Sequence, residues 1–323
     1  DAFLIKLDSD GNEIWTKLFG TPYSDIPWFS NIDNDGNILL GGETAGNLNG
    51  EINNGIIEVD GINQDSEDAF LIKVDPNGNE IWTKLFGTEG GEELHSAVTS
   101  NDGSIYITGE TRNVYDDSSE YSFIQNGFVS KLDSNGNTIW ESNIGADLIH
   151  SSANPYAIDI DDDGFIYTAG DTNLNLNGQT NQGGYDAFLI KFDQEGNEIW
   201  TKLFGTESSD YASGLKVADD GNIFISGAAS ENLNNQENNG DNDGFVIKLD
   251  QNGNEIWTKL FGTEFYDENH PLTLGNNGEI YIPGYSSGSG DVLGQVGYLY
   301  KVNQSSDPGY VDPVSGGVPV SGG

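Results

Sequence analysis

One nine-residue phrase is written repeatedly in this sequence, and it constrains the fold more than any other feature. EIWTKLFGT occupies residues 13–21, 80–88, 198–206 and 255–263, and a diverged copy, TIWESNIGA, occupies 138–146. A catalytic site needs its reactive residues only once. A phrase written five times therefore indicates a repeated structural unit.

Each copy is preceded by a second repeated phrase. DAFLIKLD (1–8) has counterparts at 68–75, 126–133, 186–193, 243–250 and 296–303. Short turns such as SDGN and PNGN separate the two phrases, and their Gly and Asn residues tolerate a positive φ. This arrangement predicts a β-hairpin.

A further hairpin is expected downstream in every unit. NIDNDGNILLGGET (31–44) and AVTSNDGSIYITGET (97–111) each place short apolar runs on either side of an Asp–Gly turn. No segment has a convincing helical period, so the chain is predicted to be all-β. Four short antiparallel strands per unit, repeated five times, favour a five-bladed β-propeller over a linear solenoid, whose units are usually shorter.

The number of strands raises the question of how the ring closes. We expect the 31–44 type of hairpin to supply the two inner strands of a blade, DAFLIKLD the third and EIWTKLFG the outermost. The third strand has six copies and the others five. The last blade can be closed by N- and C-terminal strands in two ways. Either it takes 1–8 as its third strand and 13–19 as its outer strand, or it keeps 296–303 as its third strand and takes only 13–19 from the N-terminus. The surplus strand would join molecules into a filament, or else pack on the sheet edge.

The repeat resembles the SBBP-type β-propeller repeat of bacterial, often cyanobacterial, extracellular proteins. The resemblance rests on DAFLIKLDSDGNEIWTKLFGT followed by DGNILLGGET, and it covers nearly all of residues 1–303. It implies a propeller within a large secreted or surface protein, without family-wide catalytic residues. The family is named for seven blades, so the prediction of five comes from counting units. We assign 1–304 to the propeller and 305–323 to a linker or docking tail.

The composition limits the partners. There are 53 acidic residues and 12 basic ones, for a formal net charge of −41, which disfavours nucleic acid and anionic membranes. No stretch reaches the length of a membrane span, so no membrane insertion is expected. Cys and Met are absent, even at residue 1, which favours an extracellular or cell-surface piece of a longer protein.

The basic and Trp residues follow the repeat. Ten of the twelve basic residues occupy two repeated positions, and we expect these lysines to pair with the repeated aspartates. The recurring Trp is interpreted as a wedge between blades, with stacking on a cofactor as the alternative. These Trp residues are Trp15, Trp82, Trp140, Trp200 and Trp257.

Candidate ligand-binding residues lie where the copies differ. The links 45–67, 112–125, 173–185, 228–242 and 285–295 are long and variable, and are expected to form loops on one face. Eight residues before the inner turn glycine, the units place Trp28, His95, Tyr156, Ser213 and His270. We take Trp28, His95, Tyr156 and His270 as a candidate site for a sugar or polar ligand; the alternative is space-filling at a channel rim. Acids three residues earlier suggest loop capping: Asp25, Glu92, Asp210 and Asp267.

Two turns have the carboxylate spacing of calcium loops. DIDDDG (159–164) and NIDNDG (31–36) could converge oxygen ligands from Asp159, Asp161 and Asp163, and from Asn31, Asp33 and Asp35. Gly170 replaces the bidentate Glu of an EF-hand. Calcium binding is one interpretation, and a plain Asp–Gly turn is the other.

These features together favour a protein that is not an enzyme. There is no Cys, only three His, and no spacing typical of a Ser–His–Asp triad. We predict a structural or adhesive module, calcium-stabilised and able to self-associate. The alternative is a lectin-like propeller that binds surface glycans. A more distant alternative is a quinone-dependent dehydrogenase-like propeller, whose repeats also carry a strand–turn–Trp phrase.

Overall fold

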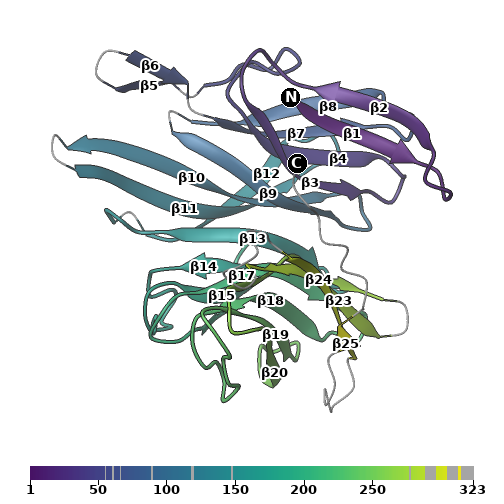
Figure 1. The fold of residues 1–323 in the computed structure, drawn as a ribbon. Coiled ribbons are helices and arrows are strands. Elements are labelled where there is room, and N and C mark those ends of the chain that lie inside the picture. Colours follow the sequence, from purple (N-terminus) through teal and green to yellow (C-terminus); the bar gives the residue numbers. More distant parts are fainter. Residues whose placement is uncertain are drawn as a thin grey trace. The chain divides into compact units, whose positions relative to one another are not determined.

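A computed structural model describes most of the chain. Residues 1–54, 67–88, 90–113, 124–146, 148–275, 278–287 and 296–302 are described in full, and 56–59, 62–65, 114–117, 120–123, 303 and 312–313 by their backbone. Every regular element in these ranges is a β-strand, which confirms the all-β prediction (Figure 1). They include no apolar helix of membrane-spanning length. The chain divides into two compact units, 1–158 with 195–197, and 159–194 with 198–323.

The first unit contains two four-stranded antiparallel sheets. One has the order β3 (Asp25–Ile32), β4 (Ile38–Thr44), β7 (Asp68–Val74), β8 (Glu80–Phe86). The other has the order β9 (Gly91–Thr99), β10 (Ile105–Asp117), β11 (Glu120–Leu132), β12 (Thr138–Ile144). Two separate hairpins are β1 (Ala2–Leu7) with β2 (Glu13–Phe19), and β5 (Ile56–Val59) with β6 (Ile62–Asp65).

The second unit repeats this arrangement. One antiparallel sheet has the order β17 (Asp210–Val217), β18 (Ile223–Ala229), β19 (Asp243–Leu249), β20 (Glu255–Phe261). Another contains β14 (Ile166–Thr172), β15 (Asp186–Phe192) and β16 (Glu198–Phe204). The last contains β21 (Asp267–Asn269), β22 (Thr273–Leu274), β23 (Glu279–Ser286), β24 (Val296–Asn303) and β25 (Asp312–Pro313). The unit boundary falls within β13 (Ala153–Ile160).

These sheets confirm the predicted strand order within a blade but not the predicted closure. Each complete sheet runs from the inner hairpin to the DAFLIKLD strand and then to the EIWTKLFG strand. β1 pairs with β2, and β24 pairs with β23 and β25, so neither predicted ring closure appears among the pairings. The five-bladed count stays a prediction. The tail 305–323 lies outside the described residues, apart from the backbone of Asp312–Pro313.

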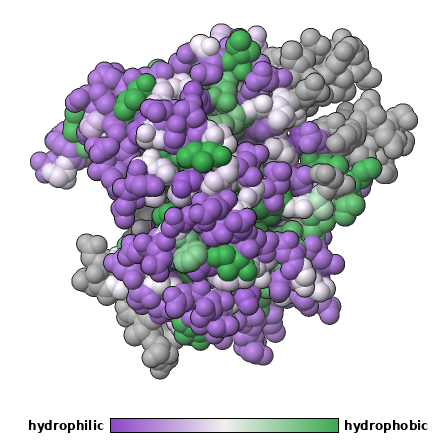
Figure 2. All heavy atoms as spheres, turned by 180° about the vertical axis from the view of Figure 1, so that it is seen from behind, coloured by the Kyte–Doolittle hydropathy of each residue, from purple (hydrophilic) through white to green (hydrophobic). Residues whose placement is uncertain are grey.

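Burial explains why the third strand is apolar on both faces. Phe70, Phe188 and Phe245 are fully buried at the same position of β7, β15 and β19. In the two-stranded hairpin β1–β2 the equivalent Phe3 is 60% exposed. Every residue of β7, β15 and β19 is buried, so these strands are covered on both faces, whereas in β1 every second residue is exposed. On the face drawn in Figure 2, hydrophilic side chains predominate, as the net charge suggests.

The Trp residues link neighbouring repeats, as predicted. Trp15 Nε1 donates to the Pro76 carbonyl over 3.3 Å, and Trp82 Nε1 donates to the Ser134 carbonyl over 3.2 Å. Both acceptors lie in the hairpin turn of the following repeat. A methyl group added at the turn residue Gly196 would lie 2.8 Å from the Trp140 ring. The indoles are thus wedges that require a small residue opposite them.

The predicted pairing of the lysines with aspartates is confirmed as an ion pair for Lys73, whereas three other lysines at the same repeated position have aromatic partners that the sequence did not predict. Lys131, Lys191 and Lys248 instead pack over aromatic rings directly opposite them on the inner strand. Their Nζ atoms lie 5.2 Å from the Tyr106 centroid, 4.9 Å from Tyr167 and 5.3 Å from Phe224. These are cation–π contacts, in which an apolar stem is buried beneath a charged head.

The first four-stranded sheet is the exception. Leu39 replaces the aromatic residue opposite Lys73, and Lys73 forms an ion pair with Asp33 at 2.8 Å. The sequence therefore located the lysines correctly in the framework, but the partner depends on the residue across the sheet.

The links between the second and third strands are more regular than expected. Residues 112–125, expected to be a loop, mostly continue β10 and β11 as a long hairpin (Figure 1). Three other links share the pattern N-L-N-[GN]-x-x-N-[NQ]-G, starting at Asn47, Asn175 and Asn232.

The repeated pattern produces the same hydrogen bonds each time. The second Asn of the pattern has a positive φ of about 50° in every copy, and its Nδ2 donates to the Thr hydroxyl of the outer strand. The third Asn donates from Nδ2 to a strand-end carbonyl, at 2.8–2.9 Å. The central leucines, Leu48, Leu176 and Leu233, are buried. The described residues of these three links are therefore hydrogen-bonded to the strands of their own sheets, and residues 288–295 of the fifth predicted link lie outside the described residues.

The predicted loop-capping acids do form caps. Asp210 Oδ2 accepts hydrogen bonds from the Thr206 backbone N at 2.7 Å and the Thr206 hydroxyl at 2.8 Å. Asp267 repeats both bonds with Thr263. The capping acid satisfies donors that would otherwise be unpaired at a buried strand start.

Candidate functional site

Three of the four candidate ligand-binding residues lie together in the first unit. The His95 ring centroid is 6.3 Å from that of Trp28, edge to face, and 5.1 Å from that of Tyr156. Trp28 is 52% exposed. The fourth, His270, belongs to the second unit and lies 5.8 Å from the ring of Tyr285.

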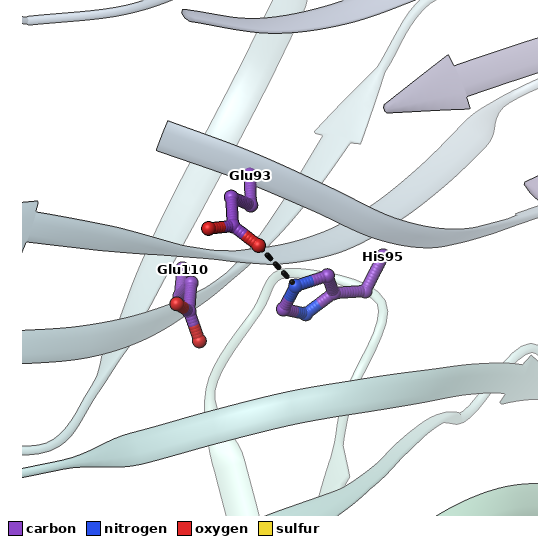
Figure 3. A group of neighbouring side chains, drawn as sticks. All are labelled: Glu93, His95 and Glu110. Atoms are coloured by element: carbon purple, nitrogen blue, oxygen red, sulfur yellow. Dashed lines mark hydrogen bonds and ion pairs between the residues drawn. The ribbon is translucent and has the colours of Figure 1, made fainter. Parts of the chain in front are cut away.

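Two glutamates complete a cluster around His95. Glu93 and His95 are two residues apart on β9, and Glu110 on β10 is paired with Glu93 in the strand register. The register shifts between Thr108 and Gly109, so His95 is the extra residue of a β-bulge. Bulges redirect side chains and are common next to functional sites. Here the bulge helps bring the imidazole beside the two carboxylates (Figure 3).

Hydrogen bonds orient the imidazole. His95 Nδ1 lies 2.9 Å from the Pro155 carbonyl oxygen. Because a carbonyl can only accept, Nδ1 carries the proton. The second nitrogen, Nε2, faces Glu93 Oε2 at 3.4 Å (Figure 3). One ligand atom from each of Glu93, His95 and Glu110 lies within 4.8 Å of the others.

Negative charge dominates this cluster. Arg112 Nη2 is 3.2 Å from both Glu93 Oε1 and Glu110 Oε1. Burial, followed by the charge of Glu93, raises the pKa of the nearby Glu43 to about 7. Burial also raises the pKa of Glu110. Three carboxylates thus share one Arg side chain, which is itself half exposed.

His95 and Glu93 favour each other's charged forms. Burial alone would lower the pKa of His95, but the Glu93 hydrogen bond and nearby negative charges outweigh it and raise that pKa. The same hydrogen bond lowers the pKa of Glu93 against the effect of burial. The pair can therefore exist as an imidazolium and a carboxylate, or as a neutral imidazole whose Nε2 lone pair faces the carboxylates.

Sequence reasoning selected His95 but missed the glutamates. The signal was available from comparing repeats position by position. In the other repeats, the residues equivalent to Glu110 are Glu43, Asp171, Ala228 and Tyr285. The residues equivalent to Glu93 are Ile26, Asn154, Tyr211 and Glu268. Only the second repeat combines two Glu with His, whereas the fifth repeat has Glu268, His270 and Tyr285.

The carboxylates proposed for calcium have separate partners. Asp33 accepts from Lys73 and from the backbone and side chain of Asn37, and these bonds lower its pKa despite burial. Asn31 donates from Nδ2 to the Ala97 carbonyl at 2.7 Å, and Asp35 is exposed.

The second turn is similar. Asp159 Oδ2 accepts from the Val217 backbone N at 2.9 Å and lies 3.4 Å from Lys216 Nζ, beside an open cavity of about 610 Å³. Asp161 accepts from the Tyr167 hydroxyl at 2.8 Å. Asp163 is exposed. Calcium at these turns stays a prediction.

Comparison with known proteins assigns the repeat. Residues 144–177 match the family model described as a β-propeller repeat, SBBP. The chain carries an SBBP-type repeat. The matched segment runs from the end of β12 through the β13–β14 hairpin to Asn177, and it therefore includes the first three residues of the Asn pattern that starts at Asn175.

Two curated relatives are similar over part of their length. A regulatory protein, FlaEY, of Caulobacter vibrioides is 34% identical over 151 residues, covering 42% of this chain and 15% of that protein. An uncharacterised WD repeat-containing protein of Acanthamoeba polyphaga mimivirus is 23% identical over 366 residues, covering 89% of this chain and 26% of that protein. The chain thus spans about a quarter or less of these relatives.

Among solved structures, a variant of Synechocystis apocarotenoid oxygenase has a TM-score of 0.51 at 12% identity, covering 97% of this chain and 68% of that chain. At such identity the likeness concerns the fold alone.

Proposed function

We propose that this chain is a non-enzymatic structural and adhesive module of an extracellular or cell-surface protein. The observation that carries the proposal is that the repeated residues are used for architecture. The repeated Trp, Lys, Asn and Asp side chains bond to neighbouring strands and turns. A rigid acidic framework of this kind suits the display of a surface in water.

Self-association is part of this proposal. In the hairpin β1–β2, Phe3, Ile5 and Leu18 are 60%, 45% and 69% exposed, whereas the counterparts of Phe3 in complete sheets are buried. An apolar hairpin of this kind is a site where a second copy can pack. Light scattering over a concentration series tests this. We expect the wild-type protein to form assemblies, and the double variant Phe3→Ser with Leu18→Ser to remain monomeric. A wild-type protein that is monomeric at high concentration would contradict self-association.

A lectin-like role is the second candidate, and the cluster of Trp28, His95 and Tyr156 favours it. An exposed indole beside polar rings is suited to stacking on a sugar face. A glycan array separates the two roles, because the lectin role requires specific, saturable binding. Trp28→Ala should then abolish binding, while Tyr23→Ala, which removes another exposed aromatic ring, should not.

Calcium stabilisation is a separate part of the proposal. If DIDDDG binds Ca²⁺, millimolar Ca²⁺ raises the melting temperature through ligand linkage, and Asp161→Ala weakens the rise. A melting temperature that is the same with calcium and with chelator would exclude the site.

A further inference from the structure

We propose that Glu93, His95 and Glu110 bind a divalent transition-metal ion of the Zn²⁺ type. This site is distinct from the turns considered for calcium, and it goes beyond the structural and adhesive role. Figure 3 shows the three side chains approaching one another from β9 and β10.

The geometry is close to that of a metal site. Zn²⁺ holds nitrogen and carboxylate ligands at about 2.0–2.2 Å, so two ligand atoms of a tetrahedral site are roughly 3.3–3.5 Å apart. His95 Nε2 and Glu93 Oε2 are separated by 3.4 Å. All three ligand atoms lie within 4.8 Å of one another. Glu110 Oε1 accepts hydrogen bonds from Arg112 and Gln125, so binding requires the ion to replace these two donors at the Glu110 carboxylate.

The orientation of His95 is the second argument. A metal-binding His usually donates its other ring N–H to a carbonyl or carboxylate, which fixes the tautomer and the ring. The 2.9 Å contact from Nδ1 to the Pro155 carbonyl has this arrangement and directs Nε2 toward the glutamates. The ring is held further by Tyr156 and Trp28, and its side chain is only 9% exposed.

The charge balance is the third argument. Glu93 and Glu110 face each other across paired strands, an arrangement that is unfavourable for like charges. Glu43 adds a third carboxylate, and Arg112 is the cation that contacts Glu93 and Glu110. The Arg112 side chain is 47% exposed, so it can turn outward when a dication enters.

The ligand set selects the metal. Imidazole nitrogen suits Zn²⁺ and neighbouring transition metals, whereas Ca²⁺ and Mg²⁺ prefer oxygen alone. The fifth repeat provides a natural comparison, because Glu268 and His270 are present but Tyr285 replaces the second glutamate. Tyr285 donates its hydroxyl to Glu268 Oε2 at 2.8 Å. That position therefore offers one carboxylate and one imidazole, and should not hold the ion.

Calorimetric titration of chelator-treated protein with Zn²⁺ tests the proposal. We expect one saturable site that Ca²⁺ and Mg²⁺ do not fill. His95→Gln and Glu110→Gln should each weaken Zn²⁺ binding by about 100-fold or more, since loss of a supporting hydrogen bond alone costs about 10–100-fold. The matched control His270→Gln should bind as the wild type does. Unchanged affinity in the His95→Gln protein, or the absence of a saturable site, would overturn the proposal.

A second measurement does not depend on the variants folding. The chain has three histidines, so the imidazole nitrogen NMR spectrum of the wild-type protein can be resolved residue by residue. Zn²⁺ should shift Nε2 of His95 and leave the rings of His150 and His270 in place. If His95 and Glu93 form only an ion pair, Zn²⁺ shifts none of the three selectively, and the assignment of a metal site is wrong.

Discussion

Replacing Asp210 by Asn should change how the stability of the protein depends on pH. Asp210 is fully buried, and burial raises its pKa from 3.8 to about 6, with its hydrogen bonds to Thr206 opposing the shift. Its pKa in the unfolded chain is about 3.9. The folded state therefore binds this proton more tightly than the unfolded state does.

The sign and size of the effect follow from this difference. The stabilisation is fully present below the unfolded-state pKa and is lost as pH rises through about 6. Two pKa units correspond to about 3 kcal/mol in total. The sequence pI is about 4.1, so solubility favours measurement above pH 5. About one pH unit of the interval between the two pKa values lies above pH 5, so raising the pH from 5 to 7.5 removes about 1.4 kcal/mol of this stabilisation.

Urea unfolding of wild type and Asp210→Asn over this pH range is the assay. Asn cannot ionise, and its amide oxygen can still accept from Thr206. We expect the stability advantage of the wild type over the variant to fall by about 1.4 kcal/mol from pH 5 to pH 7.5. Asp162→Asn, at an exposed position, reports the general effect of removing one negative charge. If the Asp210→Asn and wild-type curves stay parallel, the buried carboxylate of Asp210 does not titrate between pH 5 and pH 7.5.

Three further outcomes are expected. Phe188→Ala should cost about 3–5 kcal/mol of unfolding free energy because the ring is fully buried, whereas Phe3→Ala should cost far less; equal losses would mean that Phe3 is covered in solution. Gly205→Ala should lower the melting temperature because its methyl group would overlap the Asp186 carboxylate, and Gly297→Ala, whose methyl group meets its nearest atom at 3.9 Å, should not. Raising NaCl from about 10 mM to 500 mM should raise the melting temperature by screening the net charge of −41, and a flat or falling curve would show that the acids are well paired.

The hairpins could be predicted from the sequence because their information is local. Alternating apolar runs and turn glycines specify strand, turn and partner within about twenty residues. Gly36 and Gly164, for example, have the positive φ values of 80° and 83° that their turns require. Repetition then specified the order of strands in each sheet, because repeats with the same apolar pattern bury it by forming the same arrangement of strands.

Contacts across the sheet were decided only by tertiary structure. Lys73 and Lys191 occupy the same repeated position, yet one pairs with Asp33 and the other packs over Tyr167, because the residue opposite differs. Likewise, Glu93 and Glu110 are seventeen positions apart in the sequence and face each other only through the β9–β10 register, with a bulge at His95. The sequence alone determined where strands form and in what order they pair. Which side chains meet depends on register and bulges, since a shift of one residue moves a side chain to the opposite face.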